Sequence, residues 1–281
     1  MRRFLLFPLF FVLFVTAVFA ATGDNIPAPV TDPATAFVSG SIIVRGEGSA
    51  GADTGYSPSQ RRLMAMRAAK VDALREAAGV INGVMVSGET TVVNASVRSG
   101  KVSASVAGIV RGAEVVKEVY DPISGEASVY LSVPMTGEGG LVGQLMEHIA
   151  PMYKRGYPAF QPLQGAMAGT YDGLIVDVRA TDFKPALINR LVTGAGEIVY
   201  DPASVTQEIL ALRGGAGYTN DIGKAGTLLS ERGSKNPLVV KAASVINSTD
   251  VVITSEEAGA VVMSDRSANF LEKALVVFVL K

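Results

Sequence analysis

Three cationic side chains, Arg179, Lys184 and Arg190, follow the apolar residues 174–176. An apolar run without alternation is typical of a strand that is covered on both faces. Since α/β folds bind ligands in the loops at the carboxyl ends of such strands, the guanidinium and ammonium groups can hold a phosphate or a carboxylate there. The segment therefore predicts a small-anion site, against the alternative that these are solvated loop charges.

A second pattern, a glycine-rich fingerprint, does not predict a ligand site here because of the residues that follow it. Residues 46–51 match the G-x-G-x-x-G of dinucleotide sites. That fingerprint needs its last glycine to enter a helix, so that the phosphate meets the helix N-terminus. Here the next helix signal, Ser57-Pro58, comes too late in the chain. We therefore interpret residues 46–51 as a flexible loop and expect no cofactor.

Side chains for catalysis or metal binding are scarce. His148 is the only histidine and cysteine is absent, although zinc sites and assisted nucleophiles depend on these residue types. Glu256 and Glu257 are neighbours, so on a helix they point apart and do not form a catalytic carboxylate pair. The H-E-x-x-H, G-x-S-x-G and S-x-x-K motifs of hydrolases do not occur. We expect no catalytic, cofactor-binding or metal-binding residue, and no enzyme.

The first 20 residues have the pattern of a secretory signal peptide. Arg2 and Arg3 precede an apolar stretch, and Val18 and Ala20 suit signal peptidase. Cleavage is expected between Ala20 and Ala21, and no lipid anchor is expected because position 21 is not a cysteine. The alternative is a retained membrane anchor, since residues 4–20 reach the lower end of the roughly 17–25 residues that span a bilayer. The pattern predicts a periplasmic or secreted protein without an integral membrane segment after cleavage.

The charge balance of the chain indicates which classes of partner are expected. The chain has 25 Lys and Arg against 26 Asp and Glu, a net charge of −1, and signal cleavage removes two of the cations. Nucleic-acid binding depends on a strong basic patch, so nucleic acid is not an expected partner. The apolar content of 48% is ample for packed cores.

Stretches rich in proline and glycine predict the domain boundaries of the chain. Residues 1–20 are the signal peptide, and three prolines make residues 21–36 an extended leader. A first folded block covers residues 37–150 and a second covers residues 168–281. The Pro- and Gly-rich residues 151–167 between them form a linker.

The first block predicts an α+β domain. Ser57, Pro58 and Gln60 are the residues of a capped helix N-terminus with a capping box, and Gly79 or Gly83 is expected to end the helix. An apolar stripe should pack this long helix on an antiparallel sheet. That stripe consists of Leu63, Met66, Ala69, Ala73, Leu74, Ala77, Val80 and Ile81. Strands are expected at 41–45, 113–120 and 127–133, the last two joined by the turn 121–125, with several antiparallel strands before a closing helix at 139–149.

The second block predicts an α/β domain. Apolar runs at 174–176, 238–240, 251–253 and 275–280 are typical of strands covered by helices on both faces. A hairpin is expected around 194–196. Helices are expected after Ser204, which forms a capping box with Gln207, over 220–231, and after Ser255.

The first block resembles the bacterial LPP-20 lipoprotein family, which includes the flagellar protein FlgP and the N-terminal part of FlgT. The resemblance covers about residues 37–135 and is carried by 67–77, 83–86, 108–113 and 127–133. The second block is similar to a C-terminal module of uncharacterised exported bacterial proteins, through residues 173–179, 184–186 and 236–242.

The resemblance implies a non-enzymatic protein that assembles around the flagellar motor or the outer membrane. The chain departs from the lipoprotein members because it lacks an acceptor cysteine. We expect a periplasmic structural or assembly factor of the bacterial envelope, in the narrower version a flagellar one. Its expected partners are other envelope or flagellar proteins, or a second copy of the chain. The alternative is a periplasmic binding module for a small anionic or cell-wall ligand, using Arg179, Lys184 and Arg190.

Overall fold

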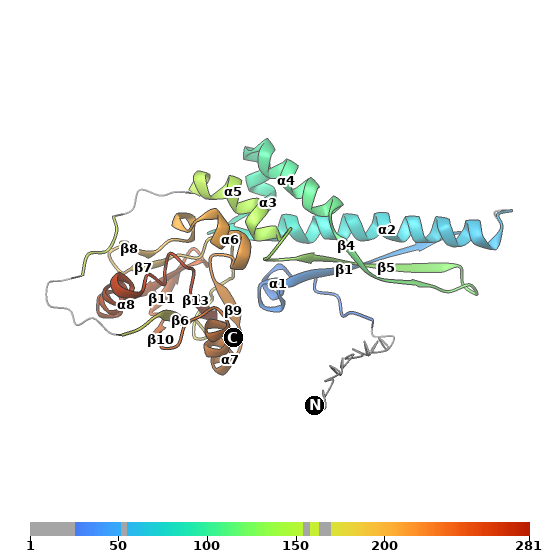
Figure 1. The fold of residues 1–281 in the computed structure, drawn as a ribbon. Helices are drawn as coiled ribbons and strands as arrows, with labels where there is room; N and C mark the ends of the chain where they lie inside the picture. The colour runs from blue at the N-terminus through green and yellow to red at the C-terminus, as the bar shows by residue number, and fades with distance from the viewer. Residues whose placement is uncertain (1–25, 52–54, 154–157, 163–169) are drawn as a thin grey trace, which may run out of the picture.

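The computed structural model describes residues 26–51, 55–153, 158–162 and 170–281. The predicted signal peptide, with Ala20 and Ala21, lies outside the described residues, as does part of the predicted linker. Within the described ranges the chain forms an elongated N-terminal module and a rounder C-terminal domain (Figure 1). This is the expected order of an α+β domain followed by an α/β domain, and the fold-class prediction is confirmed.

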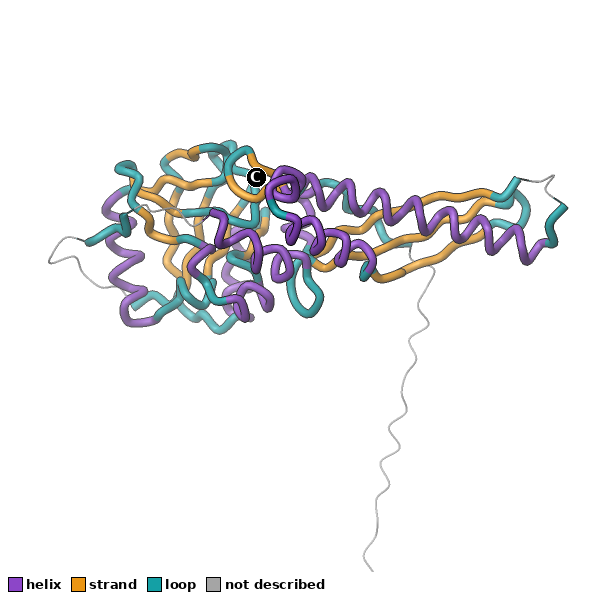
Figure 2. The backbone as a smooth tube through the Cα atoms, turned by 90° about the horizontal axis from the view of Figure 1, so that it is seen from above, coloured by secondary structure: helices purple, strands orange, loops and turns teal. Residues whose placement is uncertain are grey.

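The N-terminal module is built on a long antiparallel sheet. Strands β1 (Ser41–Ser49), β5 (Glu126–Pro134) and β4 (Glu114–Tyr120) pair in the order β1-β5-β4. Helix α2 (Pro58–Gly83) lies along one face of this sheet for its whole length (Figure 2). We call these four elements the arm. The opposite end of the arm from the C-terminal domain is its tip, where α2 begins and the turn between β4 and β5 lies (Figure 1).

The start of α2 confirms the predicted cap. The Ser57 hydroxyl accepts a hydrogen bond from the Gln60 backbone N–H at 3.3 Å, and the Gln60 side chain accepts one from the Ser57 N–H at 2.9 Å. This reciprocal capping box satisfies two backbone donors that have no partner within the helix. The helix ends at Gly83, one of the two predicted ends.

Small side chains bring α2 unusually close to β1. The buried residues of α2 are Ala65, Ala69, Ala73, Ala77, Val80 and Ile81, whereas Leu63 of the predicted stripe is 51% exposed. A Cβ on Gly46 would lie 2.1 Å from the Ala73 backbone nitrogen, and one on Gly48 would lie 2.4 Å from the Ala65 carbonyl oxygen. The prediction of a loop is therefore wrong for residues 46–49, because Gly46 and Gly48 belong to β1 and make room for the helix backbone, whereas residues 50 and 51 lie outside the strand.

The edge of β1 is also protected. The Asp72 carboxylate of α2 accepts a hydrogen bond from the outward-facing backbone N–H of Glu47 at 3.0 Å. Near the other end of the strand, Val30 of the leader forms an antiparallel bridge with Ile43. Occupied donors of this kind reduce the tendency of an edge strand to pair with other chains. The prediction of an extended leader is wrong from Pro33 on, where helix α1 (Pro33–Ser39) begins with Asp32 as its cap and proline in its first turn.

Between α2 and β4 the structure corrects the prediction of strands alone. A short hairpin, β2 (Met85–Ser87) and β3 (Thr90–Thr91), is followed by helices α3 (Val92–Arg98) and α4 (Gly100–Arg111). The buried side chains of α4 are Val102, Val106 and Ile109, which have helical spacing. The β-branched valines favour strands locally, but burial of this stripe decides for the helix. The predicted hairpin of β4 and β5 is confirmed.

The C-terminal domain contains two four-stranded sheets. One is entirely parallel, with β10 (Pro237–Lys241), β6 (Gly173–Asp177), β13 (Val276–Val279) and β9 (Gly217–Thr219) in that order. The other contains β11 (Ser244–Ile246), β12 (Asp250–Ile253), β7 (Leu191–Thr193) and β8 (Ile198–Tyr200), with β12 and β7 parallel. The predicted strands and the β7–β8 hairpin are present, although β10 lies at an edge and Val239 is half-exposed.

The start of α6 differs from the prediction. Ser204 belongs to the short 3-10 helix η1 (Pro202–Ser204), and α6 (Gln207–Arg213) starts after Thr206 without a side-chain cap. The predicted capping box of Ser204 with Gln207 is therefore wrong. Helix α7 (Ile222–Glu231) is capped by Asp221. Helix α8 (Ser255–Ala268) has a capping box formed by Thr254 and Glu257.

Candidate functional site

The N-terminal module and the C-terminal domain meet along a buried seam. The backbone N–H groups of Leu187 and Ile188 donate to the carbonyl oxygens of Met85 and Val86, each at 2.9 Å, so the segment before β7 runs beside β2. The Gly88 N–H donates to the Thr249 hydroxyl at 2.7 Å. Backbone pairing at several points along one segment fixes the two parts in a single relative orientation.

Arg190 is at the centre of this seam. Its side chain has no exposed area, and it lies 3.2 Å from the Asp201 carboxylate. The guanidinium also donates to the Ser87 hydroxyl at 3.2 Å and to the Tyr153 carbonyl at 2.7 Å. Of these three partners, Asp201 belongs to the C-terminal domain, whereas Ser87 and Tyr153 belong to the N-terminal module. One buried cation links both parts.

The other two predicted ligand-binding cations lie elsewhere. Arg179 is half-exposed and forms a two-point ion pair with Asp177, with nitrogen–oxygen distances of 2.9 and 2.7 Å. This hydrogen bonding to Arg179 holds the pKa of the Asp177 carboxyl below its usual range. Lys184 is exposed. The structure therefore does not bring all three cations to one exposed surface, because Arg190 is enclosed in the seam.

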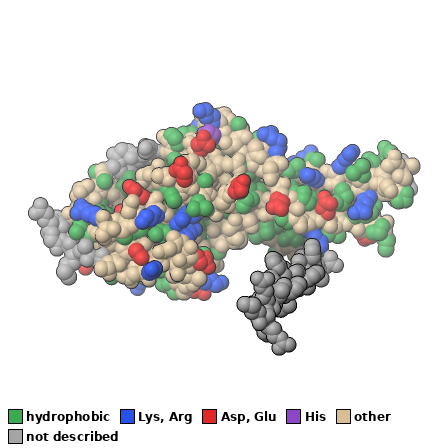
Figure 3. All heavy atoms as spheres, viewed as in Figure 1, with side chains coloured by type: hydrophobic (Ala, Val, Ile, Leu, Met, Phe, Trp, Pro, Cys, Tyr) green, Lys and Arg blue, Asp and Glu red, His purple; other side chains and the backbone are tan. Residues whose placement is uncertain are grey.

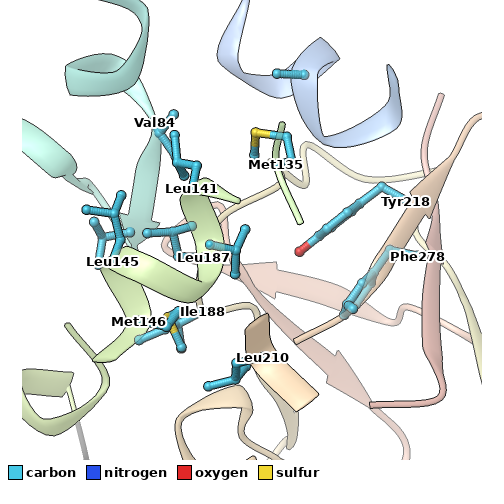
Figure 4. Packing of buried hydrophobic residues seen from close by; sticks show 14 of the residues in the cluster. Val84, Met135, Leu141, Leu145, Met146, Leu187, Ile188, Leu210, Tyr218 and Phe278 are labelled. Carbon is cyan, nitrogen blue, oxygen red and sulfur yellow. The ribbon is translucent and has the colours of Figure 1, made fainter. Parts of the chain in front are cut away.

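Helices also connect the two parts. Helix α5 (Leu141–Tyr153), predicted over 139–149, crosses α6 so closely that a Cβ on Gly143 would lie 2.8 Å from the Ala211 Cα atom. The Gln207 side chain donates to the Gly143 carbonyl at 2.6 Å. Figure 4 shows Leu145 and Met146 of α5 gathered with Ile188 and Leu210 of the C-terminal domain. The hydrophobic core is therefore continuous across the seam.

A cavity of about 160 Å³ opens beside this crossing. Its apolar wall comes from helix α1 (Pro33–Ser39), from Met135 and from Leu187. Its polar wall comes from the loop between α6 and β9, with Arg213 at the end of α6 and Arg232 at the end of α7. The sequence pattern does not single out either arginine, because a cation at a helix end followed by glycine is also the ordinary pattern of a helix C-terminus.

Two aromatic residues that line the cavity, Phe37 and Tyr218, belong to a chain of three packed rings. The ring of Phe37 on α1 meets that of Tyr218 edge-on at 5.0 Å, and Tyr218 stacks on Phe278 at 5.7 Å between ring centres. Figure 4 shows the Tyr218 and Phe278 rings side by side on neighbouring strands. The Tyr218 hydroxyl lies 2.7 Å from the Asn189 side-chain oxygen, and burial raises the pKa of Tyr218 well above its ordinary value. This hydroxyl stays protonated and acts as a structural donor.

The tip of the arm carries a second feature. A shallow groove is lined by Pro58, Ser59, Arg61, Arg62, Tyr120 and Pro122. Ile123, in the adjacent turn, is 96% exposed, and Tyr56 is also exposed. The Arg62 guanidinium lies over the Tyr120 ring at 5.8 Å, and the buried Arg61 Nε atom has no hydrogen-bond partner. The described residues that line the groove include cations and no acid.

Other kinds of site are not found in the described residues. No group of three or more His, Asp or Glu side chains within the described ranges could hold a metal ion. None of the described helices is both long and apolar enough to cross a membrane. Charged side chains on the face shown in Figure 3 are scattered over both the arm and the C-terminal domain.

Comparison with known proteins concerns the C-terminal domain. Residues 173–281 match the family model described as the second domain of Treponema pallidum Tp0624. The match begins at the first residue of β6 and includes both sheets of the domain, which supports a two-domain architecture. No curated protein matches the chain.

Proposed function

We propose that this protein is a non-enzymatic, exported structural or assembly factor of the bacterial envelope, in which the arm contacts a protein partner. The observation that carries the proposal is an arm whose tip exposes apolar and cationic side chains and whose base is hydrogen-bonded to the C-terminal domain. Helix α2 has 26 residues, so at about 1.5 Å per residue it extends roughly 39 Å. The contacts of Arg190 in the seam connect the arm to the C-terminal domain.

The side chains at the tip indicate the partner's chemistry. Ile123 and Tyr56 offer apolar area without covering neighbours, and Arg61 and Arg62 line the adjacent groove. Isolated exposed apolar residues are common on proteins, but here they lie beside two neighbouring arginines and an aromatic ring. Aromatic residues and arginine are enriched at protein interfaces. A protein segment with acidic and apolar side chains complements this surface.

Site-specific photocrosslinking in cells tests the contact. With a photoreactive phenylalanine analogue at position 123, we expect one discrete adduct with an envelope protein. The matched control is the same analogue at Val97 of α3, which is 84% exposed but lies away from the tip. Arg61→Glu combined with Arg62→Glu should abolish the adduct at position 123. Equal labelling from both positions, or labelling that survives the charge reversal, contradicts the proposal.

Gene deletion tests the biological assignment. We expect the deletion strain to lose envelope integrity, and to lose motility if the narrower flagellar version holds. Swimming at the wild-type rate with intact motors would exclude the flagellar version. A normal envelope as well would exclude an assembly role, and cell fractionation would show separately whether the chain is exported.

A further inference from the structure

Two arginines in the cavity beside the seam form no ion pair with a described acid. Arg213 and Arg232 hold each other through reciprocal side-chain hydrogen bonds to backbone carbonyl oxygens, each at 3.4 Å. None of the ion pairs between described residues involves either side chain. The described residues that line the cavity include these two cations and no Asp or Glu. Two like charges are therefore kept together on one wall.

The environment of Arg232 is electrostatically unfavourable without a counter-ion. Its Nη1 atom is buried and has no hydrogen-bond partner. Burial, and then the like charge of Arg213, lower the pKa of Arg232 more than Tyr200, Tyr218 and Glu231 raise it, although arginine still remains protonated at neutral pH. A partly buried charge that forms no ion pair costs stability. A bound anion would compensate this charge.

The position of Arg232 is fixed by the strand beneath it. The guanidinium lies against Gly217 of β9, where a Cβ would be 3.3 Å from Nη2 and 3.4 Å from Cζ. Gly215 is packed in the same way, because a Cβ there would lie 2.6 Å from the Pro202 Cβ atom. The polar wall of the cavity is therefore formed before a ligand binds, which lowers the cost of binding.

The remaining wall indicates the size and character of the ligand. Phe37, Val38, Met135, Val142, Leu187 and Leu228 supply the apolar part of the lining. The cavity volume is about 160 Å³, similar to the roughly 150 Å³ of an engineered cavity that binds benzene. A ligand with a compact apolar body and one anionic end fits this division into an apolar and a cationic wall.

We propose that the cavity between the two domains binds a small organic carboxylate, whose oxygens face Arg213 and Arg232 and whose apolar body contacts the wall formed by α1, Met135 and Leu187. Guanidinium groups match the planar geometry of a carboxylate and can bind it through two hydrogen bonds. Since the wall includes residues of both domains, the ligand also strengthens the seam. The cations of this site differ from Arg179, Lys184 and Arg190, although Leu187 of the same segment lines the cavity.

Calorimetric titration of the purified full chain tests the site. The probes are benzoate and butyrate, with benzyl alcohol as the neutral counterpart of benzoate and inorganic phosphate as an anion without an apolar body. We expect benzoate or butyrate to bind, and benzyl alcohol and phosphate to bind at least tenfold more weakly. Arg232→Gln and Arg213→Gln should each weaken carboxylate binding tenfold or more. Arg266→Gln, an exposed cation on α8, is the matched control and should leave the affinity unchanged.

Each result decides for or against the site. Absence of carboxylate binding to the wild-type chain overturns the proposal, as does equal binding of benzyl alcohol. Phosphate binding as tight as that of benzoate overturns the carboxylate assignment. Circular dichroism checks that each variant folds. Because Arg213 is only partly buried, Arg213→Gln remains informative if Arg232→Gln does not fold, and an unchanged affinity in that variant rejects the site.

Discussion

Gly46→Ala is expected to destabilise the arm by about 3 kcal/mol or more, at the upper end of the usual cost of overpacking. The new Cβ would lie 2.1 Å from the Ala73 nitrogen and 2.3 Å from the Ala69 carbonyl oxygen, both of them backbone atoms of α2. A flexible side chain could rotate away, but a helix backbone cannot. The helix must separate from β1 and lose the burial of its alanine stripe. Urea denaturation followed by circular dichroism at 222 nm measures the change, since the chain has no tryptophan.

Gly79→Ala provides the matched control within the same module. Gly79 is exposed on α2, and a Cβ there meets no atom within 4 Å. Replacing glycine in a helix by alanine should stabilise the fold by roughly 0.5–1 kcal/mol. The two substitutions add the same methyl group and should have opposite signs. If Gly46→Ala were as mild as Gly79→Ala, the close approach of α2 and β1 would be refuted.

Arg190→Ala is expected to cost about 3–5 kcal/mol, the range found when one partner of a buried ion pair is removed. Asp201 would keep its charge in a mostly buried position, where its side chain is only 11% exposed. The Ser87 hydroxyl and the Tyr153 carbonyl would also lose their donor. Because these partners belong to both domains, the loss should separate the unfolding of the arm from that of the C-terminal domain. Differential scanning calorimetry would then show two transitions in place of one.

Two further variants distinguish this role from a general effect of losing a positive charge. Arg179→Ala removes an exposed cation paired with Asp177, and it should leave the melting temperature unchanged within error, because exposed pairs contribute little. Arg190→Met together with Asp201→Asn should recover part of the loss, since no uncompensated charge remains buried. Equal destabilisation by Arg179→Ala and Arg190→Ala would contradict the assignment of Arg190 to the seam.

Local patterns in the sequence determined much of the secondary structure. The capping box of Ser57 with Gln60 depends on residues within one helical turn, and it predicted the start of α2 correctly. The alternation over 127–133 and the turn at 121–125 predicted the β4–β5 hairpin for the same reason. Apolar runs such as 174–176 predicted the strands of the C-terminal domain, because burial on both faces removes alternation. These signals act over distances of a few residues.

What the tertiary structure decided depends on residues far apart in the chain. Gly46 looks like part of a loop until α2 is packed on it, and Arg190 looks like a surface cation until Ser87, 103 residues away, is placed beside it. Arg213 and Arg232 look like ordinary helix ends until both meet at one cavity. The sequence by itself determined many of the helices and strands, since propensity and capping are local, but not α3 and α4, whose helical form depends on burial of their apolar side chains. Only the packed fold decided which charges are buried, because burial and charge compensation depend on neighbours that chain topology alone brings together.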